Sequence, residues 1–394
     1  MPDLRHESSV DALAPDPGAG AAGRRNAELD GLRGVAALIV VFYHFNYLWK
    51  ACGQPPWVTA TLERTPLALL VSGRASVLLF FVLSGFVLAL PWVRGTPERY
   101  GVFAVKRVCR IWIPYLAALL LAVLGNAFFH GRFFGSPDMW QGPVDPGLVL
   151  RHVLLLGAYP IDVFNVAFLS LRIEMRLSLV FPFLCAALLA LAPRRAVAAG
   201  VLGGIAVLFL SARTAPGSGF FTLVYAVLFM IGILLARHRR EVGAAVDRLP
   251  KTARAAGLIG ALALYLAPDV ALGAGLPARW MGVTHLLTAC GAAGVLAVAL
   301  GENGVSAWLR SPVPLFLGRI SYSLYLLHAT VLYVLAYLFW GKLPTAAFFL
   351  LFVALSFLAA VAFYRWVDRP ATDLGRRLAK RIAASRPCAK SESA

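Results

Sequence analysis

Ten windows of about twenty mostly apolar residues recur along this chain, and they constrain the fold more than any other feature. A helix of that length rises about 30 Å, which matches the hydrocarbon core of a bilayer. Of the 394 residues, 60% are hydrophobic and 14% are charged, which excludes a soluble globular domain and a disordered chain. We therefore expect an all-α polytopic transmembrane bundle of about ten spans. The expected spans cover residues 31–49, 67–91, 111–129, 166–192, 196–212, 219–236, 255–274, 280–300, 315–338 and 344–364.

The formal net charge of +18 follows this topology. If the N-terminus is cytoplasmic, the cytoplasmic segments hold 25 Lys and Arg residues and the opposite side holds 7. This bias predicts that both termini are inside. Because the basic residues lie in short loops and form no single patch, nucleic acid is not an expected partner, whereas the lipid bilayer is.

Three regions are expected along the chain. Residues 1–27 have no hydrophobic period and are predicted to be a disordered cytoplasmic tail, residues 28–377 to be the transmembrane domain, and residues 378–394 to be a basic cytoplasmic tail. From Arg365 onward the pattern favours an amphipathic helix at the membrane surface. Residues 148–160 are too short to span and favour an interfacial or re-entrant helix. The five cysteines have no paired spacing, so no metal site is expected.

The first window carries two ionisable residues, Arg33 and His44, in an otherwise apolar helix. Their spacing of eleven residues is close to three helical turns, so both side chains project from one face about 16 Å apart. Polar side chains inside a bilayer are costly and usually face a bundle interior or a water-filled cavity. The pair therefore predicts a functional path, although Arg33 snorkelling to the headgroups and His44 bonding a neighbouring helix remain an alternative.

Glu174 lies in the fourth expected span, which runs in the opposite direction. Counted from the end of each span, its depth is similar to that of His44, near 20 Å from the cytoplasmic face. A carboxylate that bonds one imidazole nitrogen makes the other more basic, so we expect Glu174 to orient His44 as a general base. An internal ion pair of Glu174 with Arg172 or Arg176 is the alternative.

Arg107 and Arg110 stand at i and i+3 just before the third expected span. Guanidinium groups on one helical face match phosphate oxygens, which would suit a phosphorylated cofactor at the cytoplasmic mouth. An ordinary positive-inside cluster would look the same. In the second span, the small Ser84-Gly85 step permits close helix packing or passage of a ligand.

His328 lies about thirteen residues into the ninth expected span, level with His44. It is a candidate second base or substrate contact, although such a histidine is often a packing residue.

Five motifs in order resemble the membrane acyltransferase family three. They are Glu28-Leu-Asp-Gly-Leu-Arg-Gly34 with the Arg33-to-His44 spacing, Phe80-Phe-Val-Leu-Ser-Gly-Phe86, Arg107-x-x-Arg110, Ser170-Leu-x-x-Glu174 followed by Pro182, and Leu317-Gly-Arg-Ile-Ser-Tyr-Ser-Leu-Tyr-Leu-Leu-His328. The resemblance covers residues 28–377. One departure is Glu174-Met-Arg-Leu-Ser178, where the family commonly has Glu-x-x-Phe-Tyr; it bears on acceptor preference more than on chemistry.

This resemblance implies a multi-pass O-acyltransferase of the bacterial cytoplasmic membrane. It would move an acyl group, expected to be acetyl, from cytoplasmic acyl-CoA to a hydroxyl of a carbohydrate, a glycan or a glycosylated metabolite. In that interpretation His44 and Glu174 are catalytic, and Arg33, Arg107, Arg110 and Ser84 bind acetyl-CoA or another acyl-CoA. Candidates for substrate or oxyanion contacts are Arg74, Arg172, Arg176, Tyr325 and His328. Direct transfer and a transient acyl-His44 both remain open. The rival hypothesis is a transporter or flippase for an anionic or glycosylated solute.

Overall fold

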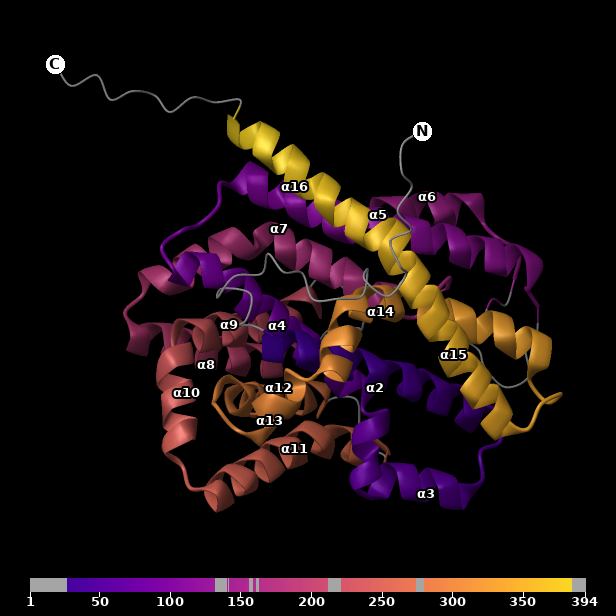
Figure 1. Cartoon of the computed structure of the whole chain (residues 1–394), viewed down its shortest axis with the longest axis horizontal. Helices are drawn as coiled ribbons and strands as arrows, with labels where there is room; N and C mark the ends of the chain where they lie inside the picture. The colour runs from indigo at the N-terminus through magenta and orange to yellow at the C-terminus, as the bar shows by residue number, and fades with distance from the viewer. Residues whose placement is uncertain are drawn as a thin grey trace, which may run out of the picture.

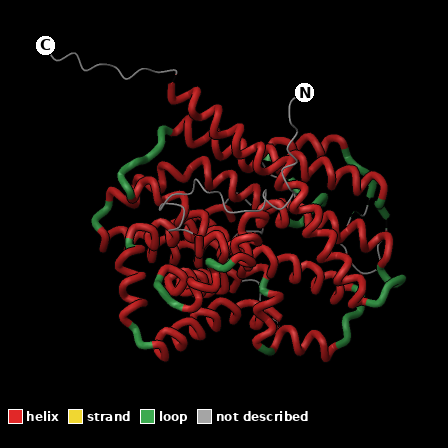
Figure 2. Tube along the Cα trace, viewed as in Figure 1, coloured by secondary structure: helices red, strands yellow, loops and turns green. Residues whose placement is uncertain are grey.

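A computed structural model describes residues 27–131, 140, 142–155, 159–160, 163–211, 221–273 and 280–384. All regular structure in these ranges is helical, which confirms the expected all-α class (Figure 2). The predicted N-terminal tail lies outside the described residues apart from Ala27, as do residues 385–394 of the predicted C-terminal tail.

The first half of the chain forms long helices joined by short ones (Figure 1). Its elements are α2 (Ala27–Ala51), α3 (Pro56–Arg64), the 3₁₀ helix η2 (Pro66–Val71), α4 (Gly73–Val93), α5 (Tyr100–Phe128), α6 (Pro146–Leu154), α7 (Phe168–Ala190) and α8 (Pro193–Ser211). The second half contains α9 (Phe221–Arg237), α10 (Arg239–Arg248), α11 (Lys251–Gly273), α12 (Met281–Leu300), α13 (Gly304–Leu309), α14 (Pro312–Phe339), α15 (Thr345–Phe363), the π-helical turn η4 (Tyr364–Asp368) and α16 (Arg369–Ala384).

Each of the ten expected spans overlaps a long helix, although the expected span 67–91 begins in η2 and continues in α4. Fewer helices meet the requirements for crossing a membrane. Within the described residues, 7 helices are long and apolar enough, or up to 8 if α9 and α10, which bend by 72°, form one broken span. The helices α8 and α11 are not among them, so ten spans are not confirmed. The expected short helix over residues 148–160 is α6, whose nine residues are too few to span.

Glycine contacts bring the helices that carry the candidate residues close together. A Cβ atom on Gly34 of α2 would lie 2.3 Å from the backbone nitrogen of Gly318 in α14. A Cβ atom on Gly318 would lie 2.3 Å from the carbonyl oxygen of Asp30. Only glycine allows such an approach between backbones, and small residues serve the same purpose in membrane bundles generally. The close packing of α2 on α14 therefore holds together the two histidines that these helices carry, His44 and His328.

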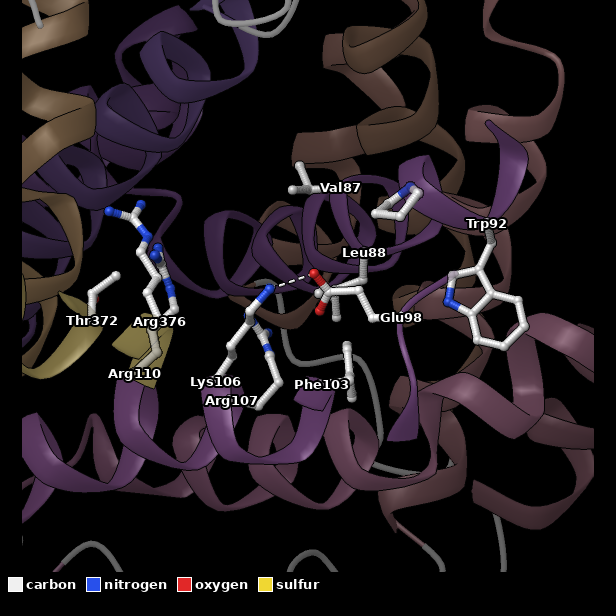
Figure 3. A pocket seen from close by; sticks show the side chains of 11 residues that line it. Val87, Leu88, Trp92, Glu98, Phe103, Lys106, Arg107, Arg110, Thr372 and Arg376 are labelled. Carbon is white, nitrogen blue, oxygen red and sulfur yellow. Dashed lines mark hydrogen bonds and ion pairs between the residues drawn. The ribbon is translucent and has the colours of Figure 1, made fainter. Parts of the chain in front are cut away.

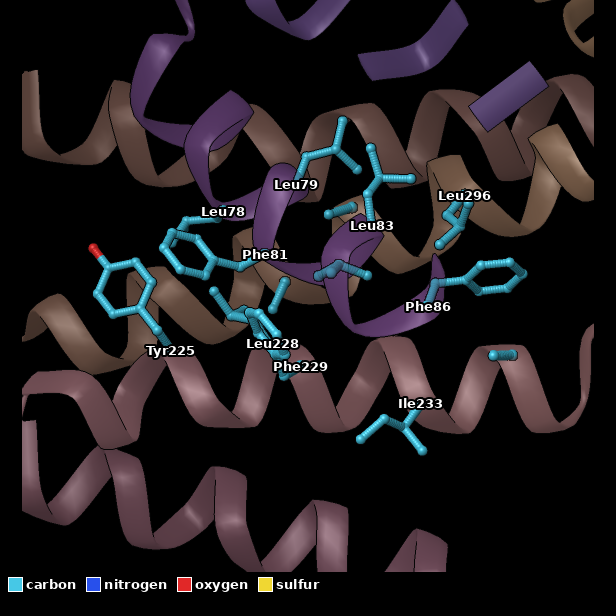
Figure 4. Close-up of a cluster of buried hydrophobic side chains, with 14 of the residues drawn as sticks. Leu78, Leu79, Phe81, Leu83, Phe86, Tyr225, Leu228, Phe229, Ile233 and Leu296 are labelled. Atoms are coloured by element: carbon cyan, nitrogen blue, oxygen red, sulfur yellow. The ribbon is translucent and has the colours of Figure 1, made fainter. Parts of the chain in front are cut away.

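A second tight crossing joins α4 to α9 and supports the apolar core. Gly85 of α4 faces the backbone of Phe229, and a Cβ atom there would lie 2.4 Å from the Phe229 carbonyl oxygen. Around this crossing the buried side chains of α4, α9 and α12 interdigitate (Figure 4). Phe81 and Phe229, for example, contact each other with ring centroids 6.0 Å apart.

The C-terminal helix α16 continues α15 through the η4 turn and lies along α5 (Figure 1). It extends to Ala384, past the expected domain boundary at residue 377. Gly375 packs against α5, where an added Cβ atom would lie 2.9 Å from the Cβ of Cys109. The predicted amphipathic helix is thus present and covers the N-terminal part of α5.

Candidate active site

The structure brings together two histidines that are 284 residues apart in the sequence. His44 of α2 and His328 of α14 lie in contact, with the Nδ1 of His44 3.1 Å from the Nε2 of His328. His328 is fully buried, whereas His44 is partly accessible. The Nδ1 of each ring also faces the carbonyl oxygen four residues earlier, at 2.9 Å for Val40 and 3.1 Å for Leu324.

These contacts fix the tautomers of the neutral pair. A carbonyl oxygen only accepts hydrogen bonds, so the Nδ1 of His328 carries the proton and its Nε2 is an acceptor. The Nδ1 of His44 must then be the donor, shared between the Val40 carbonyl and the Nε2 of His328. The Nε2 of His44 is left unprotonated. His44 therefore has an unprotonated nitrogen, which can accept a proton, on the side of the ring away from the groups that hold it.

Two polar side chains, one from α14 and one from α7, extend the hydrogen-bonding region around the histidine pair. The hydroxyls of Tyr325 and Ser170 lie 2.6 Å apart, and the Tyr325 and His328 rings contact with centroids 5.9 Å apart. Both residues belong to motifs singled out from the sequence, and the structure places them next to the histidine pair.

The three arginines expected at the cytoplasmic mouth also converge. Arg33 of α2 forms an ion pair with Asp30 at 3.3 Å and lies within electrostatic range of Arg110 and Glu174. Arg107 lies within range of both other arginines. Arg107 and Arg110 line one pocket, whereas Arg33 lies within electrostatic range but is not among the residues that line it. Two guanidinium groups on one pocket suit an anion with several phosphates.

Glu174 contacts this basic region. Its carboxylate forms an ion pair with Arg107 at 3.6 Å, and the Arg107 side chain also donates to the hydroxyl of Ser178 at 3.3 Å. Among the residues that the structure describes, Arg107 is the ion-pair partner of Glu174, in place of the expected His44 and of the alternatives Arg172 and Arg176. Equal depth in the bundle did not imply adjacency, because α7 approaches α5 here.

The remaining candidates have other surroundings. Arg172 is buried and donates to the Tyr159 carbonyl at 3.0 Å, and Arg176 donates to Thr222 at 3.3 Å. Arg74 is exposed at the start of α4, within electrostatic range of Tyr225. Ser84 is partly buried beside the tight Gly85 crossing.

A pocket of about 220 Å³ opens between α4, α5 and α16 (Figure 3). Its basic lining consists of Lys106, Arg107, Arg110 and Arg376, and its other lining residues are Val87, Leu88, Pro91, Trp92, Glu98, Phe103 and Thr372. The pocket residues Arg376 and Thr372 were not predicted from the sequence. The sequence shows that Thr372 and Arg376 lie one helical turn apart in a basic C-terminal segment. It does not show which helix their side chains would face. No group of His, Cys, Asp and Glu suited to a metal ion occurs in the part of the chain that the structure describes.

Comparisons with known proteins match most of this chain. The family model described as "Acyltransferase domain" matches residues 26–365. The acyltransferase MdmB of Streptomyces mycarofaciens is 30% identical over 340 residues, which cover 78% of this chain and 79% of that protein. The O-acetyltransferase PaAT-1 of Phomopsis amygdali is 28% identical over 131 residues, 29% of this chain and 26% of that protein. No solved structure matches the chain. The chain belongs to the acyltransferase family that its five motifs resemble, and it is a multi-pass membrane acyltransferase.

Proposed function

We propose that this enzyme transfers an acyl group, most simply acetyl, from cytoplasmic acyl-CoA to a hydroxyl of a carbohydrate, a glycan or a glycosylated metabolite. The relatives named as an acyltransferase and an O-acetyltransferase support acyl transfer to oxygen. The observation that carries the proposal is the His44–His328 contact, because it leaves the Nε2 of His44 unprotonated and able to accept a proton, on the helix that also bears Arg33.

The donor enters from the cytoplasmic mouth. Arg33, Arg107 and Arg110 bind the phosphates, and Glu174 holds the Arg107 guanidinium at 3.6 Å. The rise of about 16 Å from Arg33 to His44 is comparable to the reach of an extended pantetheine arm. The thioester therefore reaches the histidine layer while the charged nucleotide stays at the mouth.

In the transfer step, the Nε2 of His44 accepts the proton of the acceptor hydroxyl while its oxygen attacks the thioester carbonyl. The new C–O bond forms and the C–S bond breaks, and the protonated His44 returns its proton to the departing thiolate. As His44 becomes positively charged, its Nδ1–H bond to the neutral His328 strengthens. His328 thereby takes the positioning role that the sequence analysis gave to Glu174. An acyl-His44 intermediate would use the same nitrogen as nucleophile.

The experiment combines metabolite profiling with a purified assay. Mass spectrometry of envelope glycans and small molecules from cells with and without the gene should reveal one acyl mass that depends on the gene. The purified protein in lipid nanodiscs should then move isotopically labelled acyl groups from acyl-CoA to that compound, with release of the thiol in equal amount. Solute flux in proteoliposomes without label transfer would instead support a transporter and overturn the proposal.

A topology experiment tests the location of the site. Reporter fusions after Ala384 and at the α4–α5 loop should both report the cytoplasmic side, because the proposed donor site needs the arginines there. A reporter signal from the outer side at either position would contradict a cytoplasmic acyl-CoA donor.

A further inference from the structure

The basic pocket contains two cations that lie outside the Arg107–Arg110 motif. Lys106 comes from α5, and Arg376 comes from α16, together with Thr372 one turn earlier. Figure 3 shows the side chains of Arg376, Arg110, Lys106 and Arg107, all of which line this pocket. Among the residues that line this pocket, Glu98 is the one acid. The lining therefore has a clear excess of positive charge.

Packing of α16 against α5 determines the position of Arg376. Gly375 contacts α5 so closely that an added Cβ atom would lie 2.9 Å from the Cβ of Cys109 and 3.4 Å from the Cα of Lys106. The residue next to this contact is Arg376, so its backbone is fixed at the rim of the pocket.

The cations differ in their exposure to solvent. The side chain of Arg107 is 13% exposed, that of Lys106 is 36% exposed, and that of Arg376 is 67% exposed. The pocket therefore has an inner basic level at Arg107 and an outer one at Lys106 and Arg376. An anion with separated phosphates would meet both levels at once.

Both outer cations have exposed acidic partners that a ligand would displace. Lys106 forms an ion pair with Glu98, and Arg376 forms one with Asp373 at 3.0 Å. Exposed pairs of this kind contribute little, about 1 kcal/mol or less, so exchange for a phosphate dianion is favourable.

We propose that Lys106, Thr372 and Arg376 bind the ribose 3′-phosphate of the acyl-CoA donor, an inference that rests on the proposed function. CoA carries a diphosphate next to its pantetheine arm and a separate phosphate on the ribose. When Arg107 and Arg110 bind the diphosphate, the ribose phosphate lies further out, at the level of Arg376. The Arg376 fork and the Lys106 ammonium then neutralise it, and the Thr372 hydroxyl donates a hydrogen bond. The C-terminal helix is thereby part of the donor site.

The experiment measures equilibrium binding of CoA and of 3′-dephospho-CoA to the full chain in lipid nanodiscs. Wild type should bind CoA more tightly, and Arg376→Ala should lower the affinity for CoA by about tenfold, with little change for dephospho-CoA, because one charge-assisted contact is lost. Arg377→Ala is the matched control: it removes the neighbouring charge of α16, which does not line the pocket, and should leave both affinities unchanged.

Glu98→Gln should act in the opposite direction. It removes the acid that competes for Lys106, so the affinity for CoA should rise by about threefold while that for dephospho-CoA stays the same. A gain of affinity cannot arise from misfolding, which keeps the proposal testable even if Arg376→Ala folds poorly.

The possible outcomes separate this inference from the proposed function. If wild type binds both compounds equally, or if Arg376→Ala weakens both by the same factor, the 3′-phosphate site is wrong while acyl transfer from CoA stands. If wild type binds neither compound and transfers no acyl label, the proposed function fails as well.

Discussion

The histidine pair and the basic pocket are built in opposite ways. His44 and His328 meet because two helices from opposite ends of the chain approach at glycines, and the pair is held by hydrogen bonds to backbone carbonyls and to each other. The basic pocket instead takes three cations from one short stretch of α5 and adds α16 as a cover. The histidine pair depends on a few specific contacts, whereas the basic pocket depends on the combined charge of several cations.

This difference predicts how each site responds to substitution. Loss of one contact in the histidine pair removes a function that no neighbour supplies. Loss of one cation in the pocket leaves others in place, so the effect should be smaller and should concern donor binding.

The largest expected effect is that of His44. His44→Ala and His44→Gln should lower kcat/KM by about 10²- to 10⁴-fold, because a general base is lost. The protein should still insert and purify normally, as checked by size-exclusion chromatography in detergent. Near-normal transfer by either variant would show that His44 is not the general base. It would also contradict the contrast between the histidine pair and the basic pocket.

His328 should have a smaller effect of the same kind. His328→Ala should lower kcat by about ten- to a hundredfold with little change in KM for acyl-CoA, because an orienting group matters mainly in the transition state. His328→Gln, which retains a hydrogen-bond acceptor, should recover part of the rate. Equal losses in both variants, or a change confined to KM, would show that His328 does not position His44.

The α2–α14 crossing should tolerate no added side chain. Gly318→Leu should destabilise the protein by about 1–3 kcal/mol or more, because its Cβ atom would meet the Asp30 carbonyl. Gly257→Leu on α11 is the matched control, since an added Cβ atom there meets nothing within 4 Å. Thermal unfolding followed by tryptophan fluorescence compares the two. Equal stability of both variants would contradict the close approach that brings the histidines together.

The arginine motif should affect donor binding. Arg107→Ala should raise KM for acyl-CoA by about tenfold and leave KM for the acceptor unchanged, and Arg107→Lys should recover only part. Glu174→Gln should also raise KM for acyl-CoA, because Glu174 orients Arg107 through their ion pair at 3.6 Å. A fall in kcat alone for Glu174→Gln would instead support the role expected from the sequence, in which Glu174 orients His44.

The smallest effect belongs to an exposed pair at the α12–α13 connection. A hydrogen bond from Arg310 lowers the pKa of Glu302 below its ordinary value. The pair therefore stabilises the protein above the ordinary pKa of a glutamate, and this contribution is lost as the pH falls through the lowered pKa. Since the Glu302 side chain is 75% exposed, the effect should be below about 1 kcal/mol. Glu302→Gln should flatten the acid limb of a plot of Tm against pH slightly; a shift of many degrees would show that this pair is structural.

Several features could be predicted because they depend on local sequence. Hydropathy marked every long helix, and the short α6 was distinguished from a span by its length alone. The i and i+3 spacing placed Arg107 and Arg110 on one face of α5, where they line one pocket. The span count was less accurate, because apolar composition does not separate a crossing helix from a shorter or bent one such as α9.

The partners of the candidate residues could not be predicted in the same way. The depths of His44, Glu174 and His328 along their helices were similar, so three pairings were compatible with the sequence. Depth is one coordinate, whereas adjacency also needs the order of the helices around the bundle. The structure resolves this by packing α2 on α14 and α7 on α5.

What the sequence by itself determined is therefore the membrane bundle, the basic face of α5, and the family to which the motifs belong. These follow from hydropathy, helical period and charge, which act over a few turns of chain. Only the tertiary structure decided that His44 bonds His328, that Glu174 bonds Arg107, and that α16 covers the pocket. The physical reason is that glycine contacts between distant helices set these distances, and a glycine can mark a packing face in the sequence without showing which helix packs there.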